Sequence, residues 1–163
     1  MTIYLSKFRV ATRALLFVAG VILWSAEAKA QTVPAASGLS NTAAGTACFS
    51  EYYGGETNTC ASWQYWVVPL VAPVAASPIY MPVKVRVNTS NITTTPIECY
   101  AYSMDVGANS LYQTSTVAAT ATGASTLSLG DVYLPNDSPN TYFAQVVCAA
   151  WPNTSVYGVT YNF

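Results

Sequence analysis

Short strand-favouring runs separated by turn-forming residues recur along this chain from about residue 47 to its end. No window keeps apolar residues at the i, i+3, i+4 and i+7 spacing of a helix without interruption by proline or a β-branched residue. The clearest run is Val83 to Asn88, in which three valines alternate with Lys84 and Arg86. We therefore predict an all-β fold, an antiparallel β-sandwich of about eight strands.

Glycine, proline and polar turn sequences bound the expected strands. Pro69, Pro73, Pro78 and Pro82 follow one another closely, and because proline donates no backbone hydrogen bond, we expect no central strand through that stretch. The expected strands cover residues 47–53, 63–68, 83–88, 97–104, 110–118, 126–129, 141–150 and 156–163.

Residues 1–30 have the organisation of a signal peptide. Lys7, Arg9 and Arg13 precede the apolar stretch Ala14 to Trp24, and Ala28-Lys29-Ala30 is the small-x-small pattern of a cleavage site before Gln31. The apolar stretch is about 11 residues long, too short for the ~30 Å hydrocarbon layer of a membrane. We therefore expect a secreted or periplasmic bacterial protein with no membrane span after cleavage.

The remaining chain divides in two. Residues 31–46 are rich in Ala, Ser, Thr and Gly and show no periodic apolar pattern, so we expect a flexible lead-in. Residues 47–163 form the expected β-sandwich domain.

All four cysteines, Cys48, Cys60, Cys99 and Cys148, lie in that domain. An even number in an exported chain indicates two disulfides, and the absence of Cys-x-x-Cys pairs argues against a four-thiolate metal site. Three connectivities can be drawn. We favour Cys48–Cys60, which closes a short glycine-containing loop, and Cys99–Cys148, which joins two strongly predicted strands.

The charged residues restrict the function. Lys84 and Arg86 are the basic residues of 31–163, so contacts to many phosphates are excluded and we expect no nucleic-acid partner. The chain has no histidine, the commonest general base and metal ligand at neutral pH. We expect no enzymatic activity, no catalytic residue, no metal and no cofactor.

Aromatic side chains are the candidate binding residues. Trp63 and Trp66 lie on opposite sides of one expected strand, so one of them must face away from the core. A Cys99–Cys148 bond would likewise place Tyr100 and Tyr102 on an outer face, with Met104, Phe143, Gln145 and Val147.

These outer side chains have two interpretations. In the one we favour, another segment such as the proline-rich stretch 69–82 covers them, because aromatic residues more often pack than bind ligands. In the other they form an exposed patch that binds a glycan or another protein. On the second interpretation, Trp63, Trp66, Tyr100 and Tyr102 are the ligand-binding candidates.

These features favour a non-enzymatic binding or surface-interaction module with an unknown ligand. One alternative is a fimbria-like structural subunit, because the alternating last strand could be exchanged between subunits. Another is a carboxylate-based glycan hydrolase, which needs two carboxylates about 5–10 Å apart. The sequence supports no particular pair among Glu51, Glu56, Glu98, Asp105, Asp131 and Asp137.

From Val83 onward the chain resembles a family of small exported bacterial β-sandwich proteins that contain disulfides and have no assigned function. The resemblance rests on Val83-Lys-Val-Arg-Val, on Cys99-Tyr-Ala-Tyr-Ser-Met-Asp, on Tyr142 leading to Cys148, and on the final Val156-Tyr-Gly-Val-Thr-Tyr. It implies a disulfide between the strands of Cys99 and Cys148, and it implies no catalytic residues. It departs at Val68-Pro69-Leu70-Val71, where such proteins have a cysteine before the Pro-Leu-Val step.

Overall fold

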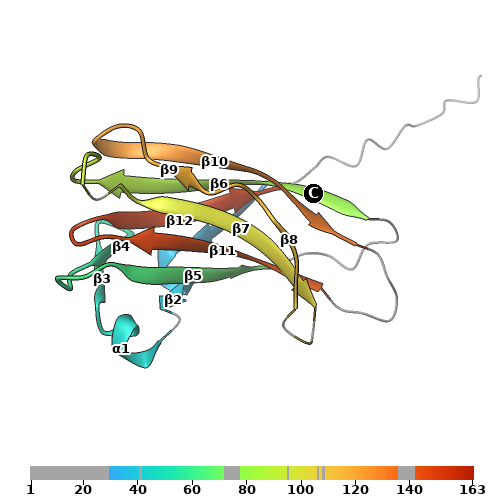
Figure 1. The fold of residues 1–163 in the computed structure, drawn as a ribbon, viewed down its shortest axis with the longest axis horizontal. Helices are drawn as coiled ribbons and strands as arrows, with labels where there is room; N and C mark the ends of the chain where they lie inside the picture. Colours follow the sequence, from blue (N-terminus) through green and yellow to red (C-terminus); the bar gives the residue numbers. More distant parts are fainter. Residues whose placement is uncertain are drawn as a thin grey trace, which may run out of the picture.

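The computed structural model describes residues 30–40, 42–71, 78–94, 96–105, 107, 109–135 and 142–163. The expected signal peptide lies outside these residues, except for its last residue, Ala30. The described chain forms two antiparallel sheets, whose long strands run along the long axis of the molecule (Figure 1). This arrangement confirms the predicted all-β sandwich.

Sheet A has the strand order β10-β6-β12-β4-β3, and β1 also pairs with β12. In the described residues its strands are β1 (Gln31–Pro34), β3 (Phe49–Tyr52), β4 (Gly55–Asn58), β6 (Ile79–Thr89), β10 (Gly123–Leu134) and β12 (Ser155–Tyr161).

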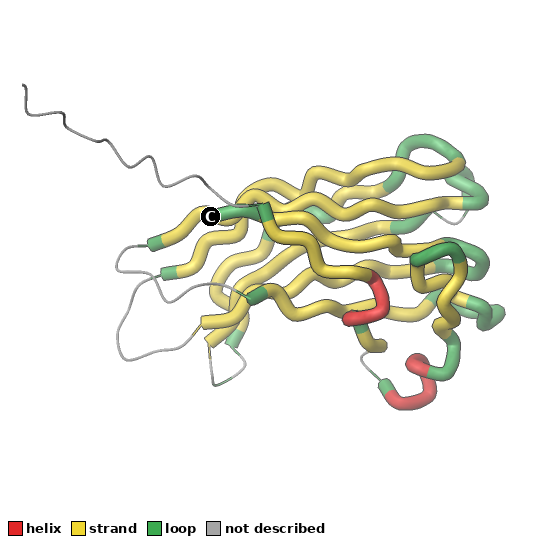
Figure 2. Tube along the Cα trace, turned by 180° about the vertical axis from the view of Figure 1, so that it is seen from behind, coloured by secondary structure: helices red, strands yellow, loops and turns green. Residues whose placement is uncertain are grey.

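Sheet B has the order β2-β5-β11-β7-β8, and β9 also pairs with β7. Two short helical segments, η1 (Ala35–Ser37) and α1 (Ala43–Thr46), interrupt the otherwise strand-dominated chain (Figure 2). The strands of sheet B are β2 (Leu39–Ser40), β5 (Gln64–Leu70), β7 (Glu98–Asp105), β8 (Ser110–Gln113), β9 (Val117–Ala118) and β11 (Tyr142–Ala150).

The core lies between the sheets and follows the alternation of the strands. On β6, Val83, Val85 and Val87 are buried while Lys84 and Arg86 are exposed, as their spacing predicts. On sheet B the side chains that share the side of Cys99 and Cys148 are buried: Ala101 and Val146 have no exposed surface. The fully buried large side chains are Trp66, Val68, Met81, Val83, Val85, Val87, Ile97, Val132, Val146, Val156, Val159 and Tyr161.

The expectation about the prolines was wrong at two positions. Pro69 lies within β5 and Pro82 within β6. At Pro82 the strand pairs only with β10, because its pairing with β12 begins at Val83. At Pro69 β5 pairs only with β11, because β2 reaches only Trp66 and Val67. Both prolines therefore lie where one side of the strand has no described partner, and a missing amide is tolerated there.

The lead-in predicted as flexible is instead built into both sheets. β1 pairs with β12 over four residues, and β2 pairs with β5. Between them Ala35 is fully buried, and its carbonyl accepts a hydrogen bond from the Trp66 indole N–H at 3.2 Å. A Cβ on Gly38 would lie 2.2 Å from the indole Cε2, so only glycine allows this close approach. The segment 31–40 thus closes the core over Trp66.

Both predicted disulfides are present. Cys99 and Cys148 are fully buried and directly opposite each other on β7 and β11, with Cα atoms 4.1 Å apart. Cys48 and Cys60 are bonded across the β3–β4 hairpin region, with Cα atoms 5.1 Å apart. In the described part of the chain, no helix has the length and apolar character that a membrane-spanning segment needs.

Candidate functional site

The outer face of sheet B carries a group of aromatic and aliphatic side chains. They come from β2, β5, β7 and β11 and from the residue that precedes β5. We call this surface the aromatic face. Its side chains are Leu39, Trp63, Tyr65, Val67, Tyr100, Tyr102, Met104, Phe143, Gln145 and Val147.

The strand register aligns these side chains in rows across the sheet. Leu39 lies opposite Val67, Val67 opposite Val147, and Val147 opposite Tyr100, so one row crosses four strands. The next residue along β7 on this face is Tyr102, which lies opposite Gln145. Directly opposed side chains pack together, which makes the middle of the face continuous.

Tyr100 and Tyr102 form a ring pair on the β7 side of the face. Their ring centroids are 6.0 Å apart and their planes differ by 28°, a stacked arrangement. The amide nitrogen of Gln145 donates a hydrogen bond to the Tyr102 hydroxyl and also contacts the Met104 sulfur at 3.6 Å. The Tyr102 ring is therefore held from the neighbouring strand.

A second aromatic pair lies at one end of the face. The rings of Trp63 and Tyr65 meet edge to face, with centroids 4.8 Å apart and planes at 76°. Burial raises the pKa of the Tyr100 hydroxyl, and the nearby Tyr65 and Tyr102 hydroxyls raise it further. Tyr65 lies opposite Ala149, two residues along β11 from Val147, which lies opposite Tyr100, so Tyr65 and Tyr100 belong to the same surface.

Of the four predicted binding residues, the structure brings three to this face. Tyr100 and Tyr102 are partly exposed, and Trp63 is 44% exposed. The prediction of Trp66 as a binding residue was wrong. Its side chain has no exposed surface and fills the core beneath Gly38, so it cannot contact a ligand. The prediction that Trp63 and Trp66 face opposite sides is confirmed.

The margins of the face are exposed, and the expectation that another segment covers its outer side chains stays a prediction. Phe143 is 42% exposed, and Leu39, which belongs to the lead-in, is 65% exposed. Val147 is buried between its neighbours in the middle of the face. Part of the segment proposed as a cover, residues 72–77, lies outside the described residues.

Three residues of the face, Leu39, Tyr65 and Val67, are neither among the binding candidates nor among the outer side chains expected from the sequence. Tyr65 shares its side of β5 with Trp63, a signal already present in the alternation. Leu39 carries no such signal, because the two-residue strand β2 is too short for an alternating pattern to be recognised.

The acidic residues lie in several separate places. Glu51 and Glu56 are directly opposite each other on the β3–β4 hairpin, and burial followed by the nearby Glu51 charge raises the pKa of Glu56. Hydrogen bonds from Asn109 lower the pKa of Asp105, which shapes the turn after β7. Asp137 lies outside the described residues, and no group of three potential metal ligands occurs among those described.

Comparisons with known proteins find similarity to solved structures in shape but none in sequence. No family model matches the chain, and no curated protein matches it. A GH26-CBM35 β-(1,4)-mannanase from Podospora anserina is similar in structure, with a TM-score of 0.48 and 10% sequence identity. The match covers 81% of this chain and 27% of the mannanase chain, so this chain spans about a quarter of that protein's length.

Proposed function

We propose that the chain is an exported, non-catalytic binding module that holds a neutral glycan against the aromatic face. The observation that carries the proposal is the stacked pair Tyr100 and Tyr102, held by Gln145 on an outer sheet surface and flanked by the exposed Trp63. Two disulfides in the described fold support export to an oxidising compartment, either secreted or periplasmic.

The chemistry of the face suits a sugar. Aromatic rings present broad apolar surfaces to the C–H groups of a pyranose, and tyrosine hydroxyls and the Trp63 indole N–H can hydrogen-bond to its hydroxyl groups. The face carries no basic side chain, and the acidic Glu98 is exposed on the same side of β7 as Tyr100 and Tyr102. A neutral polysaccharide therefore fits the face better than an acidic one does.

A glycan array probed with the purified chain, residues 31–163, is the direct test. We expect binding to neutral glycans that is lost in a Tyr100→Ala/Tyr102→Ala variant. The matched control is Tyr80→Ala/Tyr133→Ala, which removes another tyrosine pair, with ring centroids 5.1 Å apart, from the outer side of sheet A. No signal from a folded protein would reject the glycan proposal, as would equal losses in the two variants.

The fimbria-like alternative predicts a different solution behaviour. β12 pairs with β6 on one side and with β1 and β4 on the other, so it is an internal strand of its own sheet. This position favours a self-contained module, and we expect a monomer by light scattering. Oligomers that grow with concentration or require a chaperone would support the fimbria-like subunit instead.

A further inference from the structure

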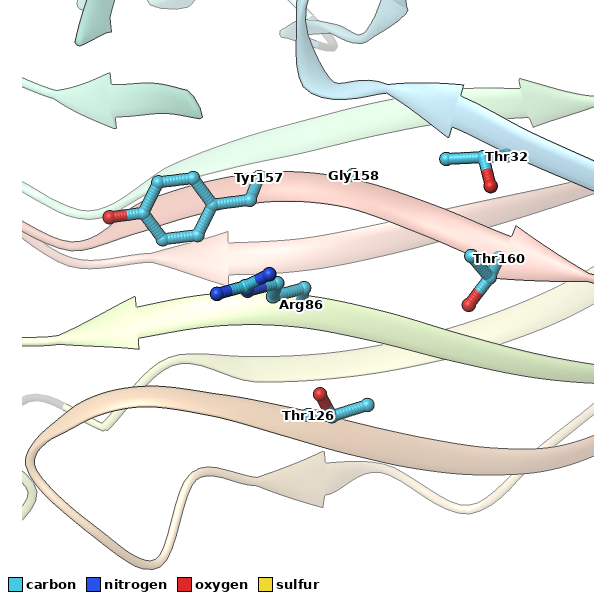
Figure 3. A pocket seen from close by; sticks show the side chains of 6 residues that line it. All are labelled: Thr32, Arg86, Thr126, Tyr157, Gly158 and Thr160. Atoms are coloured by element: carbon cyan, nitrogen blue, oxygen red, sulfur yellow. The ribbon is translucent and has the colours of Figure 1, made fainter. Parts of the chain in front are cut away.

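A hollow of about 350 Å³ lies on the outer face of sheet A, on the opposite side of the sandwich from the aromatic face. Its lining comes from β1, β6, β10 and β12, with Arg86 between Thr126 of β10 and Tyr157 of β12 (Figure 3). Three threonine hydroxyls surround it: the residues are Thr32, Thr126 and Thr160.

The hollow exists because of an irregularity in β12. The pairing of β12 with β6 shifts between Val156 and Gly158, which places Gly158 opposite Arg86. Gly158 has a φ of 155°, and a Cβ there would lie 2.8 Å from the backbone oxygen of Val33. Because no side chain can be accommodated at this point, the surface stays open where a regular strand would present a side chain.

Arg86 is positioned by its neighbours. Its guanidinium carbon lies 5.8 Å from the centre of the Tyr157 ring, within the range of a cation–π contact. The hydroxyl of that ring accepts a hydrogen bond from the Asn88 side chain at 3.3 Å, which fixes the far end of the ring. The guanidinium is therefore held against one side of the hollow.

Among the described residues, the guanidinium of Arg86 has no acidic partner. No ion pair involving Arg86 or Lys84 occurs there. Arginine carries five N–H donors in a planar fork that matches the two oxygens of a carboxylate. Lys84 lies two residues before Arg86 on the same side of β6, opposite Thr160. Its side chain does not line the hollow.

From these features we propose that the hollow binds an acidic sugar, with the carboxylate on Arg86 and the ring hydroxyls on the surrounding threonines. One guanidinium balances the single negative charge of a carboxylate, whereas a phosphate group carries a charge of about −1.5 to −2 at pH 7. Threonine hydroxyls both donate and accept hydrogen bonds, as sugar hydroxyls do. The volume is at the lower end of small-molecule sites, roughly 300–1,000 Å³, and so fits a short ligand.

The test uses isothermal titration calorimetry of residues 31–163 with glucuronate, a galacturonate trimer, glucose and inorganic phosphate, at about 0.15 M salt. We expect both uronates to bind and glucose not to bind. Arg86→Gln should weaken uronate binding by about tenfold or more, the scale of a lost charge-assisted hydrogen bond. Tighter binding of the trimer would indicate a polysaccharide as the source, and equal affinities would indicate a single sugar acid.

Lys84→Gln is the matched control, since it removes the same charge from the same strand and face. It should leave the affinity within about twofold, because Lys84 does not line the hollow and an exposed charge without a direct contact contributes little. Equal losses in the two variants would overturn the proposal in favour of general electrostatic attraction. Absence of uronate binding at millimolar concentration would also overturn it, as would equal binding of glucose or phosphate.

This site is independent of the glycan site proposed on sheet B. The Tyr100→Ala/Tyr102→Ala variant should keep its affinity for uronates while losing the neutral glycan. Loss of uronate binding in that variant, with the fold intact by circular dichroism, would show that the uronate does not bind at Arg86.

Discussion

Tyr100 and Tyr102 lie on the same side of β7, with ring centroids 6.0 Å apart and nearly parallel planes. Two rings separated by one residue on a strand necessarily share a face, and here that face points away from the core because Cys99 and Ala101 point into it. The buried disulfide of β7 therefore determines which side of the strand carries the tyrosines.

Replacement of Trp66 by alanine should destabilise the fold strongly. The side chain is fully buried and donates a hydrogen bond to Ala35, so we expect a loss of about 3–5 kcal/mol in the free energy of unfolding. Trp63→Ala is the control. Because the Trp63 side chain is 44% exposed, its removal should lower the free energy of unfolding by less than about 1 kcal/mol. Urea denaturation followed by circular dichroism measures both, and similar losses would contradict the assignment of the two tryptophans.

Replacement of Gly38 by alanine tests whether the segment 31–40 is part of the fold. The added Cβ would lie 2.2 Å from the Trp66 indole, so either the segment or the indole must move. We expect a loss of about 1–3 kcal/mol, as for other overpacked positions. Ala36→Ser, at an exposed position of η1, is the control. An unchanged urea midpoint in Gly38→Ala would show that the segment is not packed on Trp66 in solution.

The two disulfides should contribute unequally to stability. Cys99 and Cys148 are 49 residues apart and Cys48 and Cys60 are 12 apart, so chain entropy assigns about 4 and about 3 kcal/mol respectively. Urea denaturation of the two double-alanine variants should therefore show the larger loss for Cys99→Ala/Cys148→Ala. Removal of Cys48–Cys60 causing the larger loss would contradict this ranking.

Glu56 should make stability depend on pH. Its pKa is raised in the folded state, first by burial and then by the Glu51 carboxylate opposite it. A raised pKa means that the folded state holds the proton of Glu56 more tightly than the unfolded state does. Protonated Glu56 therefore contributes to the stability of the fold below the ordinary glutamate pKa, and this contribution is lost as pH rises through the raised pKa of the folded state.

Glu56→Gln removes the ionisable carboxyl group. It therefore removes both the fall in stability that follows ionisation of Glu56 and the repulsion from Glu51. The variant should be more stable than the parent near pH 7 by about 0.5 kcal/mol or less, given solvent screening, with the difference shrinking toward about pH 4. Thermal unfolding at several pH values measures it. Glu98→Gln is the control, because Glu98 is exposed and lies opposite the uncharged Ala118 and Ala149. If the stability of Glu56→Gln differs from that of the parent by the same amount at every pH, the Glu56 carboxylate is not the source of the difference.

The sequence predicted the parts of the fold that repeat a simple pattern. The alternating valines of β6 and the four cysteines led to the sandwich, the disulfides and the outward direction of Tyr100 and Tyr102. These predictions succeed because a strand places successive side chains on opposite faces, so one buried cysteine determines its neighbours.

Features created by tertiary contacts were missed. β1 and β2 carry no periodic pattern, and their order comes from pairing with β12 and β5 and from the close approach of Gly38 to Trp66. The sequence predicts strand breaks at Pro69 and Pro82, but each lies where its strand has a described partner on one side only. Nor did the sequence reveal the hollow beside Arg86, which depends on the shifted register at Gly158.

The central claim is that a neutral glycan binds the outer face of sheet B. Heteronuclear NMR titration of residues 31–163 with the neutral glycan that gives the strongest array signal tests it most directly. The largest amide shifts should fall on Trp63 to Val67, Glu98 to Met104 and Phe143 to Ala149. Largest shifts on the outward-facing residues of β6, β10 and β12 would contradict the claim.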